Sequence, residues 1–339
     1  MKITVKKSIL ILIGVVIVFL VFLYFNAGRP PARFKYGVTF SAAQAQSLGL
    51  DWKEVYNKML DDKASNADGL GVKLVRVPVY WDQVEPKAGE YHFDDLDYQV
   101  KLAEQYNARL VLTMGLKAPR WPECHQPGWV KELNASDAAD NALLSYIEAA
   151  VLRYYNSPAV AIWQVENEPF LQFGECGKMN KKLLDKEIAL VKKLDPSRPI
   201  LISDSGELSS WTEAGNRGDI FGTTLYRFVF SDVFKRYWVN YIPSWFYRIK
   251  AGWVRLLNPG KQIAIIELQA EPWTTKGILN TPIEEQFKTM SMKKFESILG
   301  VARATGLSPQ YLWGVEWWYW MKDQGHPEFW ERAKNLFEQ

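Results

Sequence analysis

Histidine and cysteine are scarce in this chain, whose 339 residues include three of the first and two of the second. The sequence has no Cys-x-x-Cys pair and no His-x₃-His pair, the spacings on which many zinc sites are built. It therefore predicts no metal site, and no motif in it calls for a cofactor.

The chain also lacks a surplus of basic charge beyond its N-terminus. The formal net charge is +3, but six basic residues and no acidic ones precede Tyr36, which leaves −3 for the rest: Lys2, Lys6, Lys7, Arg29, Arg33 and Lys35. Domains that bind nucleic acid carry clustered Lys and Arg. We therefore expect no nucleic-acid partner.

Charge is absent altogether from Ser8 to Gly28, and the run from Ile9 to Phe25 is apolar apart from Gly14 and Tyr24. Twenty-one helical residues at ~1.5 Å each span roughly 30 Å, the thickness of one hydrocarbon core. The residues that follow make a poor cleavage site, so the pattern favours a retained signal anchor over a cleaved signal peptide. Basic residues are nearly balanced on the two sides of the run and do not settle its orientation.

Past residue 35 the chain has no low-complexity segment and no linker, and short apolar runs alternate with helical patterns. Such runs are typical of buried parallel strands. There are eight: Tyr36–Phe40, Lys73–Val77, Arg109–Met114, Val160–Val165, Ile200–Ser203, Ile220–Leu225, Ile263–Glu267 and Tyr311–Val315. Five amphipathic segments lie between them: Trp52–Leu60, Leu96–Tyr106, Ala138–Tyr155, Lys181–Leu194 and Ile283–Thr305.

Eight strand–helix units predict a (β/α)₈ barrel, of the TIM-barrel class. A doubly wound open sheet is the alternative, but no Gly-x-Gly-x-x-Gly follows the first strand. We therefore expect a transmembrane signal anchor over residues 1–28, a short linker over 29–35 and one barrel domain over 36–339.

Two of the predicted strands lead into glutamates, Glu168 and Glu267. The mouth of such a barrel is where catalysis is usually done, and glycosidic bond cleavage requires two carboxyl groups. The chain also has 15 tryptophans, whose flat rings suit stacking against sugars. Together these features indicate a glycoside hydrolase.

Three segments, in the order of the strands, carry a more specific pattern: Arg76-Val77-Pro78-Val79-Tyr80-Trp81-Asp82-Gln83-Val84-Glu85-Pro86, Asn167-Glu168-Pro169 and Glu267. The pattern resembles glycoside hydrolase clan A, and within it the cellulase-like family 5 and its relatives, which are retaining enzymes. The resemblance implies that Glu168 is the acid/base, Glu267 the nucleophile and Asn167 the ligand of the sugar 2-hydroxyl. Arg76 and Tyr226 are expected to stabilise the nucleophile. The two carboxyl groups should lie roughly 5 Å apart.

Aromatic side chains complete the expected substrate site. Clan members commonly place a Trp beneath the sugar after the eighth strand, where Trp317 and Trp318 are the candidates and strand alternation allows one of them. Trp121 and Trp129 are candidate stacking platforms in the loop after the third strand. Lys117, Arg120, His125, Glu207 and Trp211 are weaker candidates, and Glu166 is interpreted as a structural partner of Arg76 or another polar residue.

The sequence departs from many family 5 enzymes, which carry a His at the end of the third strand and another before the Tyr of the sixth. Residues 164–168 are also similar to the β-galactosidases of family 35. The sugar and its linkage therefore stay open. The prediction is a retaining glycosidase cleaving a β-linked oligo- or polysaccharide. A transglycosylase that remodels envelope glycan and a non-catalytic carbohydrate-binding barrel are the alternatives.

A glycan substrate favours placing the barrel on the extracytoplasmic side of the cell membrane, as a single-pass protein. There a disulfide between Cys124 and Cys176 becomes chemically reasonable. The two residues lie in the loops after the third and fourth strands, which emerge side by side at the barrel mouth. We therefore predict that bridge.

Overall fold

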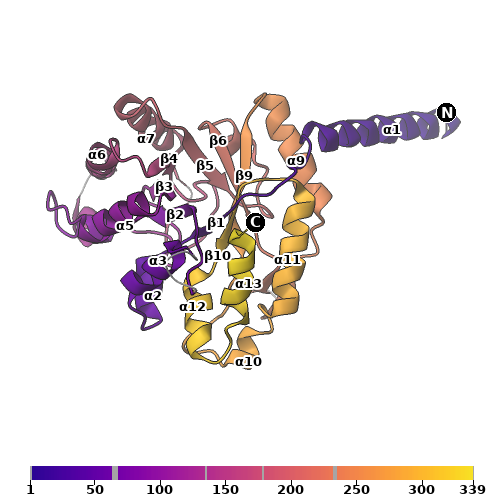
Figure 1. The fold of residues 1–339 in the computed structure, drawn as a ribbon. Coiled ribbons are helices and arrows are strands. Elements are labelled where there is room, and N and C mark those ends of the chain that lie inside the picture. The colour runs from indigo at the N-terminus through magenta and orange to yellow at the C-terminus, as the bar shows by residue number, and fades with distance from the viewer. Residues whose placement is uncertain (1, 63–67, 134–135, 178, 232–234, 339) are drawn as a thin grey trace.

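The computed structural model describes residues 2–62, 68–133, 136–177, 179–231 and 235–338. Eight parallel strands form a closed barrel in the order β1-β10-β9-β6-β5-β4-β3-β2, which confirms the predicted (β/α)₈ class (Figure 1). The strands are β1 Tyr36–Thr39, β2 Leu74–Pro78, β3 Arg109–Met114, β4 Val160–Val165, β5 Ile200–Asp204, β6 Ile220–Leu225, β9 Gln262–Gln269 and β10 Gln310–Trp313.

Helices form the outer layer of the barrel. They are α2 Ala42–Ser47, α3 Trp52–Leu60, α4 Trp81–Val84, α5 Asp94–Gln105, η1 Gly128–Glu132, α6 Ser136–Tyr154, α7 Lys181–Leu194, α8 Thr212–Gly215, α9 Ser244–Leu257, α10 Ile283–Gln286, α11 Met292–Thr305, α12 Val315–Asp323 and α13 Glu328–Phe337. Polar caps fix several starts: the Asp51 side chain accepts from the Lys53 N–H before α3, and Asn180 does the same for Lys182 before α7. The buried faces of these helices pack on the strands.

The interior of the barrel is filled by a separate small cluster of side chains from different strands, Val111, Leu201, Ile220, Ile266 and Tyr311. This packed interior closes the barrel below its mouth. Functional side chains must therefore lie at the ends of the strands or in the loops that follow them.

Three elements differ from the prediction. The eighth strand ends at Trp313, because Gly314, with a φ of 135°, turns the chain into α12. The segment 283–305, predicted as one helix, is split into α10 and α11. Between β6 and α9 lies an additional antiparallel hairpin of β7 (Phe228–Ser231) and β8 (Arg236–Val239).

A disulfide joins Cys124 to Cys176, with Cα atoms 5.1 Å apart, which confirms the predicted bridge. Its two loops follow β3 and β4, so the bond ties together neighbouring walls of the barrel mouth. Structural disulfides persist mainly in oxidising compartments.

The first helix, α1 (Lys2–Asn26), projects away from the barrel beside α9 (Figure 1). Its part from Lys7 to Asn26 is long and apolar enough to cross a membrane, a property that signal sequences share. Most of its apolar side chains between Ile9 and Phe25 are exposed.

Candidate active site

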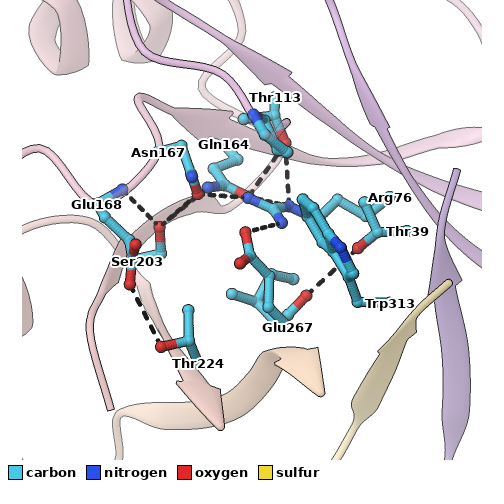
Figure 2. Close-up of polar contacts among 12 residues, drawn as sticks. Thr39, Arg76, Thr113, Gln164, Asn167, Glu168, Ser203, Thr224, Glu267 and Trp313 are labelled. Atoms are coloured by element: carbon cyan, nitrogen blue, oxygen red, sulfur yellow. Dashed lines mark hydrogen bonds and ion pairs between the residues drawn. The ribbon is translucent and has the colours of Figure 1, made fainter. Parts of the chain in front are cut away.

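Glu267, on β9, is held by two donors from other strands or their loops. Its Oε1 accepts from Arg76 Nη1 at 2.6 Å, and its Oε2 accepts from the Tyr226 hydroxyl at 3.0 Å (Figure 2 shows the first pair). Burial and the charge of Glu267 raise the pKa of Tyr226 well above its usual value, so the phenol stays protonated and donates. A guanidinium and a phenol together stabilise negative charge on this carboxylate.

Arg76, on β2, connects Glu267 to the strands on the other side of the barrel. Its Nε donates to Gln164 Oε1 at 2.8 Å, and its Nη2 donates to Asn167 Oδ1 at 2.7 Å. A longer bond of 3.3 Å joins Nε to the Thr113 hydroxyl. The fully buried guanidinium therefore links β2, β3, β4 and β9 around the site.

Glu168 follows β4 in a backbone conformation that few residues other than glycine adopt, with a φ of 43°. Its N–H donates to Ser203 Oγ at 3.1 Å, and its carboxyl Oε1 accepts from the Thr224 hydroxyl at 3.3 Å (Figure 2). Burial raises the pKa of Glu168 well above its usual value, and Glu267 and Glu123 add to the shift. The carboxyl group therefore keeps its proton at a pH where an exposed glutamate loses it.

Glu123 is a third buried carboxyl at this site, and sequence reasoning missed it. Its Oε2 accepts from Asn167 Nδ2 at 2.9 Å. Burial, followed by the charge of Glu267, raises the pKa of Glu123 to about 8. The one signal in the sequence was its position next to Cys124, whose bridge holds this loop against the site.

The tryptophan at the site is Trp313, which ends β10 and is 7% exposed (Figure 2). Its indole N–H donates to Glu271 Oε1 at 2.8 Å, and the Arg120 guanidinium lies 4.2 Å from its ring centroid. Arg120 in turn pairs with Glu271 and, at 2.9 Å, with Glu316. These contacts fix the plane of the Trp313 ring.

The prediction that Trp317 or Trp318 contacts the sugar is wrong. Both lie on α12 with fully buried side chains, and their indole N–H groups donate to Gln286 Oε1 and Ala270 O, each at 2.7 Å. The physical reason is the turn at Gly314, which ends the strand before these residues and carries them into the helical layer.

The other predicted candidates divide between structural and exposed positions. Glu166 accepts from the N–H groups of Leu116 (2.7 Å) and Lys117 (2.6 Å), so it braces the loop after β3 rather than Arg76. The following residues are also engaged within the protein: Lys117 with Glu168 O and Leu171 O, Trp129 with Glu85 O, Glu207 with Tyr247, Trp211 with Ser205 O, and His125 with Arg120 O.

Trp121 is the exposed exception, at 70%, and it begins a row of aromatic rings that leads to the site. Its ring centroid lies 6.5 Å from that of Phe173, which lies 6.3 Å from Trp273, which lies 5.7 Å from Tyr226. Sequence reasoning found the two ends of this row but not Phe173 and Trp273. Among the described residues, no group of three or more His, Cys, Asp or Glu side chains has an arrangement that would hold a metal ion.

The sequence profile of Cellulase (glycosyl hydrolase family 5) matches residues 35–240, more than half of the chain. The chain belongs to this family. The matched part includes Arg76, Asn167, Glu168 and Tyr226, while Glu267 lies beyond it. This family is one of the glycosyl hydrolase families.

Similar proteins include endo-1,4-β-xylanase 2 of Claviceps purpurea, 29% identical over 130 residues that cover 37% of this chain and 38% of the relative. A probable mannan endo-1,4-β-mannosidase A of Aspergillus niger is 29% identical over 123 residues, which cover 33% of this chain and 30% of the relative. The chain thus spans about a third of the length of these relatives. In fold it is similar to native xylanase 10B of Thermotoga maritima, with a TM-score of 0.53, 16% identity and coverage of 86% and 84% of the two chains.

Proposed function

We propose that this glycoside hydrolase is a retaining β-glycosidase that acts by double displacement on an oligo- or polysaccharide. Glu267 is the nucleophile and Glu168 the acid/base. The observation that carries the proposal is the contrast between these two buried carboxyl groups. The Glu267 carboxylate is paired with the Arg76 guanidinium and the Tyr226 hydroxyl, whereas the Glu168 carboxyl has a raised pKa and accepts from the neutral Thr224 hydroxyl.

In the first step Glu168 donates its proton to the glycosidic oxygen as the bond to the leaving group breaks. Glu267 attacks the anomeric carbon at the same time and forms a covalent glycosyl-enzyme. In the second step Glu168, now a carboxylate, removes a proton from water, whose oxygen displaces Glu267 and releases the sugar. The chemistry requires no metal ion or cofactor.

Asn167 is proposed to hold the sugar 2-hydroxyl through the remaining N–H of its amide. Arg76 occupies the amide oxygen at 2.7 Å, and Glu123 accepts one of the two Nδ2 hydrogens. One donor is left, so Asn167 presents an N–H, rather than an acceptor, to the substrate.

The aromatic row from Tyr226 to Trp121 supports a substrate of several sugar units. Rings stack on the C–H faces of sugars, and the exposed end at Trp121 lies three ring contacts from the ring that touches Glu267. The xylan- and mannan-acting names of the relatives agree with a β-linked polymer, while the sugar itself is left to experiment.

For location we propose a single-pass anchor formed by α1, with the barrel on the extracytoplasmic side of the cell membrane. The apolar length of α1 supports the anchor, and the disulfide supports an oxidising compartment for the barrel.

The decisive experiment is Glu267→Ala on a β-linked oligosaccharide with an activated leaving group. We expect turnover to fall by at least about 10³-fold. Added azide should restore part of it as a glycosyl azide of opposite anomeric configuration. The native enzyme should give products of retained configuration in NMR, and lack of both azide rescue and retention would contradict the proposal. Products longer than the substrate would identify the transglycosylase alternative.

A further inference from the structure

The C-terminal end of α1 is bound by α9 rather than left as a free tether. Arg248 Nη2 donates to Gly28 O at 2.8 Å, Arg255 donates to Ala27 O, and Asn26 Nδ2 donates to Gly252 O at 2.7 Å. The last carbonyl groups of a helix have no partner within it and lie at the negative end of its dipole. Two arginines of the barrel therefore supply the cap of α1.

Gly252 lets the two helices cross closely. A Cβ atom at this position would overlap the backbone oxygen of Leu23, so the crossing excludes any larger residue. Leu23 and Ala27 are buried in the contact, and the Phe19 ring lies edge-on to Trp253 with centroids 6.4 Å apart. The end of α1 is thus packed as part of the folded barrel.

We propose that the last turn of α1 and the Arg248–Arg255 face of α9 form a permanent joint, which fixes the barrel against the bilayer with its mouth turned away from lipid. The inference rests on the proposed anchor and extends it, because it assigns α9 as the membrane-proximal side. Residues up to Gly28 then stay in the mature protein, since cleavage there would remove partners of Arg248, which is 6% exposed.

The position of the joint along the barrel sets the direction of the mouth. Arg248 Nη1 donates to Thr305 O at 3.0 Å, a few residues before β10 begins. Arg255 Nε donates to Lys261 O at 3.3 Å, immediately before β9 begins. The joint therefore lies where the strands start, and Glu168 and Glu267 lie where they end.

Lipid is the surface that fits this side of the molecule. Phe22 and Phe25 near the end of α1 are exposed, and so are Leu256 and Leu257 in the last turn of α9 (Figure 1 shows the two helices together). Apolar side chains of this kind are favourable in the interfacial region of a bilayer. With that side on the membrane, the mouth receives glycans from the aqueous phase and not sugars attached to lipids of the same bilayer.

Distance measurements on the full chain in phosphatidylcholine vesicles test the joint. Spin labels at Val16→Cys on α1 and Gly300→Cys on α11 leave the disulfide-bonded cysteines unlabelled, and both positions have room for a label. We expect one narrow distance distribution. Gly252→Leu should broaden it, whereas Gly14→Leu, at a position where an added Cβ atom meets nothing within 4 Å, should leave it unchanged. A broad distribution without either substitution overturns the joint, and that result does not depend on whether Gly252→Leu folds.

The direction of the mouth is tested with one oligosaccharide offered free in solution or attached to a lipid of the same vesicles. We expect hydrolysis of the free form and at least a tenfold lower rate on the lipid-linked form. Equal rates overturn the proposed direction. No hydrolysis of either form counts against the proposed function, and the spin-label distances still decide the joint.

Discussion

Glu123 places a third carboxyl group beside the two that the sequence identifies. Its carboxyl accepts from Asn167, its charge helps to raise the pKa of Glu168, and its own pKa is raised by the charge of Glu267. Glu123 lies in the loop after β3, far from Glu168 and Glu267 in the sequence, and the fold brings it to the site. The protonation of Glu168, the proposed acid/base, is therefore set in part by a residue that no motif marks.

We expect Glu123→Gln to move the alkaline limb of the pH profile of kcat/KM to lower pH. An ionised Glu123 raises the pKa of Glu168, so a neutral amide lowers it, and Glu168 loses its proton earlier as pH rises. Because the pKa of Glu123 is itself about 8, the difference should be largest above that pH. Gln retains an acceptor for Asn167, so the rate at the optimum should change less than with Glu123→Ala. Glu90→Gln, at an exposed position, is the control, and an unmoved limb in Glu123→Gln would count against the electrostatic role.

We expect substitutions of Trp313 and of Trp317 to have different effects, because the first residue lies at the proposed site and the second is buried in the helical layer. Trp313→Ala should lower kcat/KM, because the ring that Arg120 and Glu271 hold at the site is lost. Trp317→Ala should instead lower the free energy of unfolding by about 3–5 kcal/mol, as for other buried large side chains, with kcat/KM of the folded enzyme retained. Steady-state kinetics and urea unfolding of both variants check this. A loss of kcat/KM in Trp317→Ala, with stability retained, would show that Trp317 contacts the substrate after all.

At the scale of the elements, a disulfide joins the loops after β3 and β4, which form two neighbouring walls of the site. Cys124 and Cys176 are separated by 52 residues, so the bond removes considerable entropy from the unfolded chain. We expect the Cys124→Ser/Cys176→Ser double variant to lose roughly 2–4 kcal/mol of unfolding free energy. Reduction of the native protein should lower its stability by a similar amount. Equal stability of the oxidised native protein and the variant would be the contrary result.

The sequence predicts the barrel well because each buried strand is an apolar run of the right length, and six of the eight runs match the observed strands within about a residue at each end. It does not predict the β7–β8 hairpin, because the only turn residues between Phe228 and Val239 are Ser231 and Asp232, with no Gly, Pro or Asn beside them. It places the end of the eighth strand too late because a single glycine conformation, at Gly314, decides where the chain leaves the barrel.

For the site, too, the sequence predicts residues on strands better than residues in loops. Arg76, Asn167, Glu168, Tyr226 and Glu267 lie on or just after strands, where a pattern fixes their position, and the structure brings them together. Glu123, Phe173 and Trp273 come from loops, whose paths depend on contacts between distant segments. Pattern in a single sequence does not encode such contacts.

At the scale of the whole molecule, the apolar helix α1 is long enough to cross a membrane, a property that signal sequences share. We expect the full-length chain to stay in the membrane pellet after carbonate extraction, because the predominantly apolar 20-residue segment Lys7–Asn26 matches the hydrocarbon thickness. Intact mass of the pelleted protein should include the residues before Gly28. A supernatant chain that starts near Gly28 would show that the segment is a cleaved signal sequence.

The guanidinium of Arg76 has a consequence for how this site can vary. All three of its nitrogens donate hydrogen bonds, to Glu267, Asn167 and Gln164. A Lys at position 76 would have one ammonium group and could not reproduce this planar arrangement of donors. Changes at these positions should therefore be strongly epistatic, with double-mutant effects far from the sum of the single ones. These four residues can then be replaced only together, whereas residues of the surrounding loops can be replaced one at a time.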